Sequence, residues 1–164
     1  MTETADIEAK VVAALGRLGV EYRILECDPD YADTAAFCTR YGHSPDVCGN
    51  TIIVGSKREP KQYSACVVKA STRLNVNRTV RQLMGVSRLS FASAEETMAV
   101  TGMMIGGVTA FLLPEDPPIY VDDKVLELDL VILGSGSRSS KFEISPRVFE
   151  ALPNAKIVPE LSLT

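Results

Sequence analysis

The chain has 164 residues, of which 46% are hydrophobic and 23% charged, and its net charge is −4. This composition excludes a disordered or fibrous protein, and the length suits a single domain, residues 1–164, whose core needs no disulfides. The acidic start lacks the basic-then-apolar order of a signal peptide, and no apolar run is long enough to span a membrane, so we expect a cytoplasmic protein without a membrane partner.

The first half of the chain predicts helices and strands in alternation. Apolar residues at helical spacing, each set followed by a glycine, predict two helices, residues 7–18 and 33–41. Short runs rich in β-branched and aromatic residues predict three strands, residues 22–25, 51–54 and 63–70. The last two of these strands flank a loop that contains glycine and proline, so we expect them to form a hairpin.

Three further helices are predicted after the hairpin, each with its own boundary signal. Residues 76–84 form a basic amphipathic pattern that ends at Gly85. Ser93 and Glu96 have the spacing of the capping box that begins a helix. Ser145 precedes a proline, an order that is typical of a helix start.

The remaining apolar runs are short: residues 111–113, 119–121 and 131–133, with a turn at 114–118. The chain then carries about seven strands, which are too many and too short for a doubly wound parallel sheet. The pattern therefore favours the α+β class.

Charge is unevenly distributed along the chain. Residues 57–88 carry eight basic side chains and one acidic one, whereas the parts before and after them carry net charges of −5 and −6. A basic segment between acidic flanks is one way to build a phosphate-binding face. The alternative is a solvated helix surface next to a charged hairpin tip.

Side chains that commonly bind metals are few and dispersed. The chain has one histidine, His43, and no C-x-x-C pair among Cys27, Cys38, Cys48 and Cys66. Zinc sites normally show closely spaced ligands, so we predict no metal. We predict free, mostly buried thiols, and the alternative that the count of four allows is two disulfides. Residues 134–138 lack the third glycine of a dinucleotide-binding fingerprint and the lysine of a P-loop, so no cofactor is predicted either.

Gly106 and Gly107 stand together between two short apolar runs. Adjacent glycines indicate a sharp bend, or a place where other groups approach the backbone closely. The exposed N–H groups of such a corner can bind a carbonyl oxygen, an oxyanion or a phosphate. The alternative is an ordinary tight loop within a β-rich core.

Several short segments, including Gly-Gly-Val-Thr and Gly-Ser-Gly-Ser, follow one another in a fixed order, at residues 74–77, 85–86, 94–96, 106–109, 120–122, 134–137 and 143–146. Their order resembles the YbaK/EbsC family, the stand-alone relatives of the editing domain inserted in bacterial prolyl-tRNA synthetases. The resemblance covers residues 7–152. It implies a mixed, partly closed β-barrel of about seven strands flanked by helices.

The resemblance implies hydrolysis of the ester that joins a wrongly attached amino acid to the 3′ end of a tRNA. The partner would be the acceptor end of aminoacyl-tRNA, with an aminoacyl-tRNA synthetase as a second partner. Ester cleavage needs donors for the oxyanion that develops, and backbone N–H groups would supply them. The implied substrate-binding residues are Gly106, Gly107, Val108, Thr109, Ser135, Gly136 and Ser137.

The chain departs from the family pattern at three positions. Family members place a lysine just before the strand that corresponds to residues 51–54, and this chain has Asn50 there. Ala110 and Leu112 also stand where the family has a proline and a glycine. An asparagine donates a hydrogen bond but carries no charge. We therefore expect weakened deacylation, a different substrate or no catalysis.

Lys69 is the residue that we predict to replace the missing cation in the catalytic site. It follows an apolar run, and in an alternating strand it would share a face with Val67 and Ala65. A buried, unpaired ammonium is costly, so such a lysine has either a partner or a function. The alternative places Lys69 at an edge, with its ammonium in water.

Three hypotheses of function follow from these observations. The first is an aminoacyl-tRNA deacylase that acts in trans, with Asn50 and Lys69 in an altered catalytic site. The second is a catalytically silent module that binds tRNA, a nucleotide or a synthetase. The third is a partner of a synthetase that uses its surface instead of a pocket.

Overall fold

The computed structural model describes residues 3–113 and 117–163. Its helices are α1 (Glu3–Leu18), α2 (Thr34–Tyr41), α3 (Arg81–Met84), α4 (Ala94–Thr101) and α5 (Asp123–Leu126). Its strands are β1 (Tyr22–Glu26), β2 (Gly49–Ser56), β3 (Tyr63–Lys69), β4 (Arg73–Leu74), β5 (Leu89–Phe91), β6 (Ile119–Asp122), β7 (Val131–Gly134), β8 (Ser140–Ile144), β9 (Ala155–Val158) and β10 (Ser162–Leu163). None of the described helices has the length and apolar character needed to cross a membrane.

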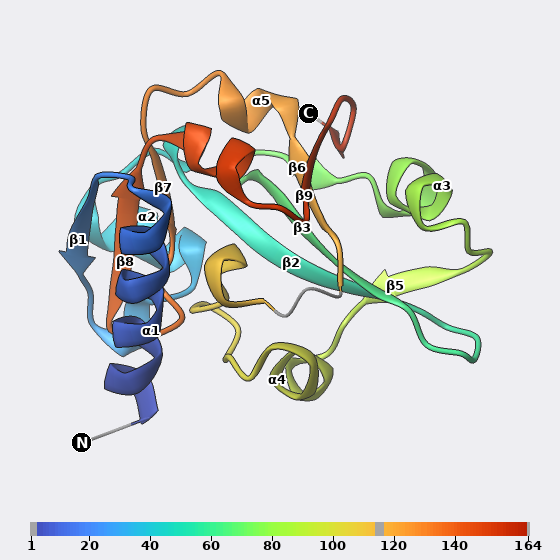
Figure 1. Cartoon of the computed structure of the whole chain (residues 1–164), viewed down its shortest axis with the longest axis horizontal. Coiled ribbons are helices and arrows are strands. Elements are labelled where there is room, and N and C mark those ends of the chain that lie inside the picture. The colour runs from blue at the N-terminus through green and yellow to red at the C-terminus, as the bar shows by residue number, and fades with distance from the viewer. Residues whose placement is uncertain (1–2, 114–116, 164) are drawn as a thin grey trace.

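The described strands form three sheets. The largest has the order β5-β2-β3-β6-β9 and is mixed, because β5, β2 and β3 pair antiparallel whereas β3, β6 and β9 pair parallel. The second is antiparallel with the order β1-β8-β7, and the third is the short pair β10-β4. Figure 1 shows the hairpin of β2 and β3 running along the molecule, with α3 and α4 beside its far half.

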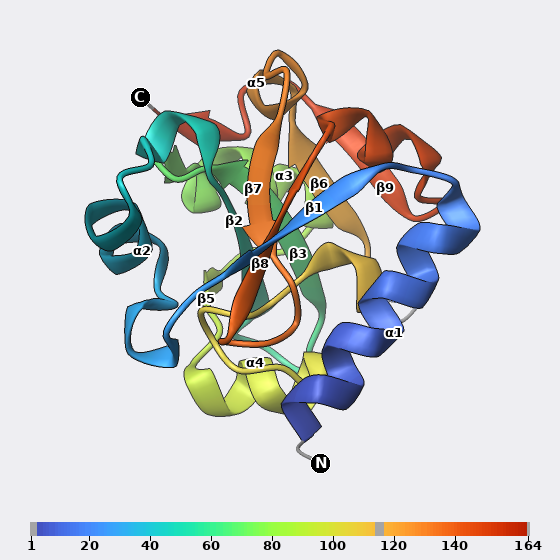
Figure 2. The same ribbon diagram turned by 90° about the vertical axis from the view of Figure 1, so that its left-hand side faces the viewer.

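The main core lies between the two larger sheets and α1. It includes Val11 of α1, Val67 of β3, Leu133 of β7 and Phe142 of β8, all buried. Figure 2 shows α1 and α2 on either side of the strands β1, β7 and β8. Burial of these apolar side chains is the main stabilising contribution to such a fold.

Both faces of the central strand β3 are covered. Ala65 and Val67 belong to the main core, whereas Cys66 and Val68 belong to a second cluster that extends to α3. Successive side chains of a strand point to opposite faces, so a strand covered on both faces is apolar throughout. This explains why the sequence of β3 lacks an alternating pattern.

Several predictions from the sequence are confirmed. The chain is α+β, and the helices predicted at residues 7–18 and 33–41 are α1 and α2. The hairpin is formed by β2 and β3. The capping box at the start of α4 is complete, because the Ser93 hydroxyl accepts from the Glu96 N–H and the Glu96 carboxylate accepts from the Ser93 N–H.

The prediction of a partly closed barrel of about seven strands needs correction, since sheets and barrels differ in how their edges pair. Within the described part of the chain there are ten strands, and no closed barrel is formed. The two larger sheets are joined by an isolated bridge between Cys48 and Ile132. Several additional strands are only two to four residues long, so pairing defines them better than sequence pattern does.

Three further segments differ from their predictions. The helix predicted at 76–84 is a π-helix, Val76–Val80, followed by the single turn of α3. The apolar run at 111–113 falls mostly in a 3₁₀ turn, Ala110–Leu112, and the helix after Ser145 is also 3₁₀, Pro146–Ala151. In the turn predicted at 114–118, residues 114–116 lie outside the described residues.

Two loops that contain glycine, residues 105–108 and 134–137, contact each other through their backbones. The Gly136 N–H donates a hydrogen bond of 2.6 Å to the Gly107 carbonyl oxygen. A Cβ on Gly134 would lie 2.3 Å from the Val108 carbonyl oxygen, and one on Gly107 would lie 3.0 Å from the Ser137 carbonyl. Only glycine allows backbones to approach this closely.

This contact generates a stability prediction. We expect Gly134→Ala to lower the free energy of unfolding by about 1–3 kcal/mol, because the added methyl group would force the two loops apart. Gly16→Ala in α1 is the matched control, since a Cβ there meets no atom within 4 Å. It should raise stability by about 0.5–1 kcal/mol. Urea unfolding followed by circular dichroism measures both changes, and equal effects would contradict the predicted backbone contact.

Candidate functional site

A cavity of about 420 Å³ opens beside the 105–108 loop. Its walls are the first turn of α2, residues 49–53 of β2, the 105–108 loop and the neighbouring ends of β7 and β8. Its lining combines apolar side chains, such as Ile53 and Phe91, with a few polar groups. A concave, mostly apolar site with few polar groups is typical of small-molecule binding sites.

Backbone N–H groups of the 105–108 loop are available at the cavity. Gly106 and Val108 line the cavity, and their N–H groups have no protein acceptor among the described residues. The Gly107 N–H instead donates to the Met104 carbonyl oxygen at 2.9 Å and closes a turn. The donors of this corner are therefore those of Gly106 and Val108. The N–H of Gly107, which the family resemblance places among the substrate-binding residues, is used in the turn.

Four of the predicted substrate-binding residues are buried and do not belong to the described cavity lining. Thr109 is 1% exposed, and its hydroxyl accepts from the Phe111 N–H within the 3₁₀ turn. Ser135 is buried, and its hydroxyl donates to the Ser140 carbonyl oxygen at 2.9 Å. Ser137 is also buried, and Gly136 bonds the first glycine loop. Of the second loop, Gly134 is the residue that lines the cavity.

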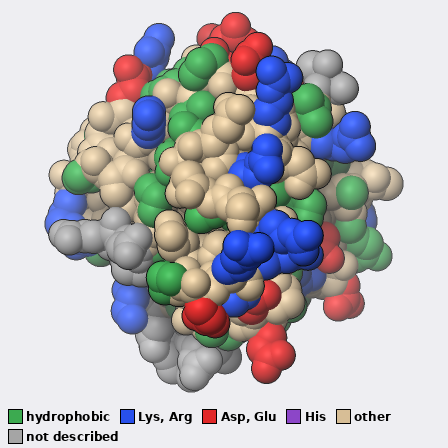
Figure 3. All heavy atoms as spheres, turned by 90° about the vertical axis from the view of Figure 1, so that its right-hand side faces the viewer, with side chains coloured by type: hydrophobic (Ala, Val, Ile, Leu, Met, Phe, Trp, Pro, Cys, Tyr) green, Lys and Arg blue, Asp and Glu red, His purple; other side chains and the backbone are tan. Residues whose placement is uncertain are grey.

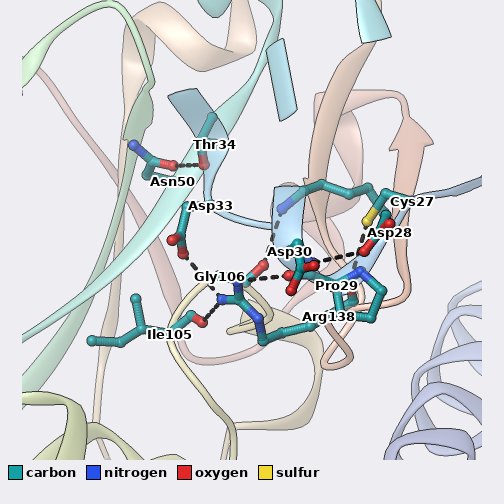
Figure 4. A network of polar contacts seen from close by, with 11 residues as sticks. Cys27, Asp28, Pro29, Asp30, Asp33, Thr34, Asn50, Ile105, Gly106 and Arg138 are labelled. Carbon is teal, nitrogen blue, oxygen red and sulfur yellow. Dashed lines mark hydrogen bonds and ion pairs between the residues drawn. The ribbon is translucent and has the colours of Figure 1, made fainter. Parts of the chain in front are cut away.

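Asn50 lines the cavity from β2. Its side-chain oxygen accepts a short hydrogen bond from the Thr34 hydroxyl at the start of α2. Figure 4 shows the Asn50 amide nitrogen on the side away from Thr34. The bond therefore orients the amide, whose N–H donors have no acceptor within residues 3–113 and 117–163 and could bind a ligand.

Lys69 is half-buried at the end of β3, opposite Gly49, and does not belong to the described cavity lining. The lysine that lines the cavity is Lys141 of β8, which is 5% exposed. Its Nζ donates to the Gly106 carbonyl oxygen at 3.0 Å and lies 5.5 Å from the centroid of the Phe37 ring. The structure thus brings Asn50 together with Lys141, and not with Lys69.

Sequence reasoning missed Lys141 because β8 was not predicted. The signal was present, since Ser140, Phe142 and Ile144 alternate with Lys141 and Glu143. Such a period of two is typical of a strand and would have placed Lys141 on the face opposite Phe142.

Burial lowers the pKa of Lys141, and the charge of Arg138 lowers it further. The thiols of Cys27 and Cys48 and the carboxylate of Asp33 act in the opposite direction. The charged form of a lysine is disfavoured when it leaves water. The Lys141 ammonium therefore loses its proton at lower pH than an exposed lysine does.

Arg138 holds three segments together at the rim of the cavity (Figure 4). Its Nη1 donates to Asp33 Oδ1 at 3.0 Å and to the Ile105 carbonyl oxygen at 2.6 Å, and its Nη2 donates to the Pro29 carbonyl oxygen at 2.8 Å. Gly106 has a φ of +92°, which L side chains rarely adopt, and a Cβ there would lie 2.2 Å from Nη1, so this position favours glycine. A planar guanidinium suits such contacts because its donors are fixed in one plane.

The four cysteines are free and buried, as the sequence predicts. Cys38 of α2 and Cys48 lie behind the cavity, with their sulfur atoms 3.5 Å apart. Burial, followed by the hydrogen bond with Cys38, raises the pKa of Cys48 to about 12. The Cys48 thiol is therefore protonated at neutral pH and does not act as a nucleophile. Among the described residues, no group of three or more potential ligands could hold a metal.

The Arg138 contacts predict a specific loss of stability. We expect Arg138→Met to lower the free energy of unfolding by about 1–3 kcal/mol, because three acceptors lose their donor. Arg147→Met is the control, since the Arg147 guanidinium forms an exposed ion pair with Glu150. It should change stability by about 0.5 kcal/mol or less. Urea unfolding measures the free energy of unfolding of both variants. A similar effect of the two substitutions would contradict a structural role of Arg138.

A model of the aminoacyl-tRNA editing domain family matches residues 28–152 of the chain. Among curated proteins, the chain is 32% identical over 81 residues to the uncharacterized protein YwhH of Bacillus subtilis (strain 168). That match covers 49% of this chain, and the chain spans about half, 51%, of the relative's length.

Two solved structures share the fold over nearly the whole chain. The crystal structure of hypothetical protein APE2540 superposes with a TM-score of 0.82 at 28% identity, covering 94% of this chain and 99% of that one. A candidate trans-editing enzyme for prolyl-tRNA synthetase superposes with a TM-score of 0.80 at 20% identity, covering 100% and 99%. At 20% identity the second likeness establishes the fold alone.

Proposed function

The chain belongs to the aminoacyl-tRNA editing domain family, and on that premise we propose that it is a trans-editing deacylase of mischarged tRNA. In this proposal residues 1–164 act as one domain that hydrolyses the ester between an amino acid and the 3′ end of the tRNA. The observation that supports it most directly is a cavity lined by Gly106 and Val108, two residues whose backbone N–H groups have no protein acceptor in the described structure.

These groups suit the chemistry of ester hydrolysis. Attack of water on the ester carbonyl carbon places negative charge on the carbonyl oxygen, and donors fixed at that position lower the barrier. The N–H groups of Gly106 and Val108 would serve as such donors, with the Asn50 amide as a third. Because their orientation is set by hydrogen bonds elsewhere, little reorganisation is needed when the charge develops.

The apolar part of the cavity would determine which amino acid is bound. Ile53 of β2 and Val108 are both nearly fully buried and line it, together with Phe91 and Ala92. A cavity of about 420 Å³ has room for an amino-acid ester, whereas the body of a tRNA must stay outside. We therefore assign an uncharged, apolar amino acid to this site.

The tRNA body would be held by the basic segment of the chain. Lys57, Arg81 and Arg88 surround a surface hollow between the hairpin and α3, and its described lining contains no acidic side chain. Figure 3 shows lysine and arginine side chains gathered on this end of the molecule. Such a surface binds phosphates and reads little sequence.

A second candidate function is a module that binds aminoacyl-tRNA without hydrolysing it. The observation that favours it is Asn50, which is uncharged at the position where the resemblance to the YbaK/EbsC family implies a lysine. Both functions need the same cavity, and only catalysis separates them.

Deacylation of a panel of mischarged tRNAs tests the proposal. We expect the purified chain to accelerate hydrolysis of at least one ester of an apolar amino acid, and Asn50→Ala to lower kcat by about 10–100-fold, because a donor to the oxyanion is lost. Release of radiolabelled amino acid measures the rate, and thermal melting checks folding. Binding of the tRNA without any acceleration would favour the silent module, and absence of both would contradict the family function in this chain.

The basic surface predicts a salt-dependent affinity. The double variant Arg81→Ala/Arg88→Ala should weaken tRNA binding and reduce its dependence on salt, while kcat stays within about twofold, because phosphate contacts act through counterion release. Lys10→Ala/Arg17→Ala on α1 removes the same charge from another surface and should leave the affinity nearly unchanged. Titrations at several salt concentrations compare the slopes. Equal slopes for both double variants would place the tRNA elsewhere.

A further inference from the structure

Lys141 is the one cation among the described residues that line the cavity. We propose that Lys141 is the catalytic cation of this chain, and that its ammonium, which enters from β8, supplies the positive charge that Asn50 does not supply from β2. This inference rests on the proposed deacylase function. It assigns a role to a residue at a different place in the fold from the lysine that the family pattern predicts.

The Lys141 ammonium lies beside the 105–108 loop, whose N–H groups would bind the oxyanion. Nζ of Lys141 lies 3.0 Å from the carbonyl oxygen of Gly106, a residue that lines the cavity and whose N–H has no acceptor among the described residues. An ammonium has three donors, and in the described structure the Gly106 carbonyl takes one of them. The remaining donors are available to an oxygen atom of a bound ester.

If Lys141 had a purely structural role, we would expect its buried ammonium to pair with a carboxylate. No ion pair of Lys141 exists among the described residues, and the nearby Asp33 is paired with Arg138. The other groups that face it are the thiols of Cys27 and Cys48 and the ring of Phe37. A buried ammonium without a counter-ion is costly, although the face of an aromatic ring offsets part of the cost. An anionic ligand or transition state in the cavity would supply the missing negative charge.

The proposed step balances without any co-reactant besides water. The water oxygen bonds to the ester carbonyl carbon, and the resulting oxyanion is stabilised by the Lys141 ammonium and the N–H groups of Gly106 and Val108. The bond from that carbon to the ribose oxygen then breaks. The ribose oxygen leaves with a proton that originates from the water, and the carboxyl group keeps the water oxygen. Lys141 remains protonated throughout.

The experiment compares Lys141→Met with Lys69→Met in single-turnover deacylation. We expect Lys141→Met to lower kcat by about 100-fold or more with little change in KM, because it removes charge stabilisation that exists only in the transition state. The kcat of Lys69→Met should stay within about twofold of the wild-type value, since Lys69 lies outside the described lining. Circular dichroism melts confirm that the variants fold, and Lys141→Gln replaces Lys141→Met if the latter does not.

Moving the lysine from β8 to β2 distinguishes a catalytic charge from a purely structural role of Lys141. In Lys141→Met, the second change Asn50→Lys should restore kcat by about tenfold or more, because it returns a cation to the same corner from β2.

The pH dependence of deacylation provides a second test. Since Lys141 acts in its charged form and its pKa is lowered by burial, deacylation by the unchanged chain should fall as pH rises through that pKa, and Lys141→Met should lack this fall.

The outcomes separate the two proposals. If the unchanged chain deacylates and folded Lys141→Met keeps the same kcat and pH profile, the role of Lys141 is overturned while the deacylase function stands. The same holds if Asn50→Lys fails to rescue a folded Lys141→Met. If the unchanged chain hydrolyses no ester in the panel, the deacylase function is overturned and the role of Lys141 falls with it.

Discussion

Contact between the two glycine loops orients the donors of the cavity. The Gly107 carbonyl accepts from the Gly136 N–H, and in a trans peptide the next N–H points to the opposite side. The Val108 N–H is therefore turned away from the second loop. In the same way, the Ile105 carbonyl bonds Arg138, which turns the Gly106 N–H away from the guanidinium. Each free donor is fixed by a hydrogen bond that its own peptide unit makes on its other side.

Burial of Lys141 follows from the packing of β8. Phe142 and Ile144 are fully buried in the main core, and this anchors the strand between β1 and β7. Since side chains alternate along a strand, the residue beside Phe142 must face the other way, toward α2 and the cavity. The apolar burial of its neighbours offsets the cost of taking an ammonium out of water. A lysine can thus be held in this wall without a carboxylate partner.

The sequence predicts the parts of this structure that depend on local signals. α1, α2 and the capping box of α4 follow from periodicity and capping residues, and the β2–β3 hairpin follows from two β-rich runs around a turn. The cavity could not be predicted in full, because it depends on which loops meet. The turn that the Gly107 N–H closes with Met104 is local, but the orientation of the next peptide depends on the bond between Gly136 and the Gly107 carbonyl, about thirty positions apart in the sequence. Lys141 was missed for a different reason, an unrecognised strand.

When the donors of a site are backbone N–H groups, the site can keep them while its cation comes from a different strand. The N–H donors of Gly106 and Val108 depend on glycine at 106, 107, 134 and 136, and none of these requirements involves residue 50. Asn50 and Lys141 occupy different walls of one cavity, so in the proposed deacylase a cation on either strand would face the same bound ester. On this view the choice of amino acid depends on the apolar wall around Ile53, and moving the lysine changes the rate of ester cleavage more than its selectivity.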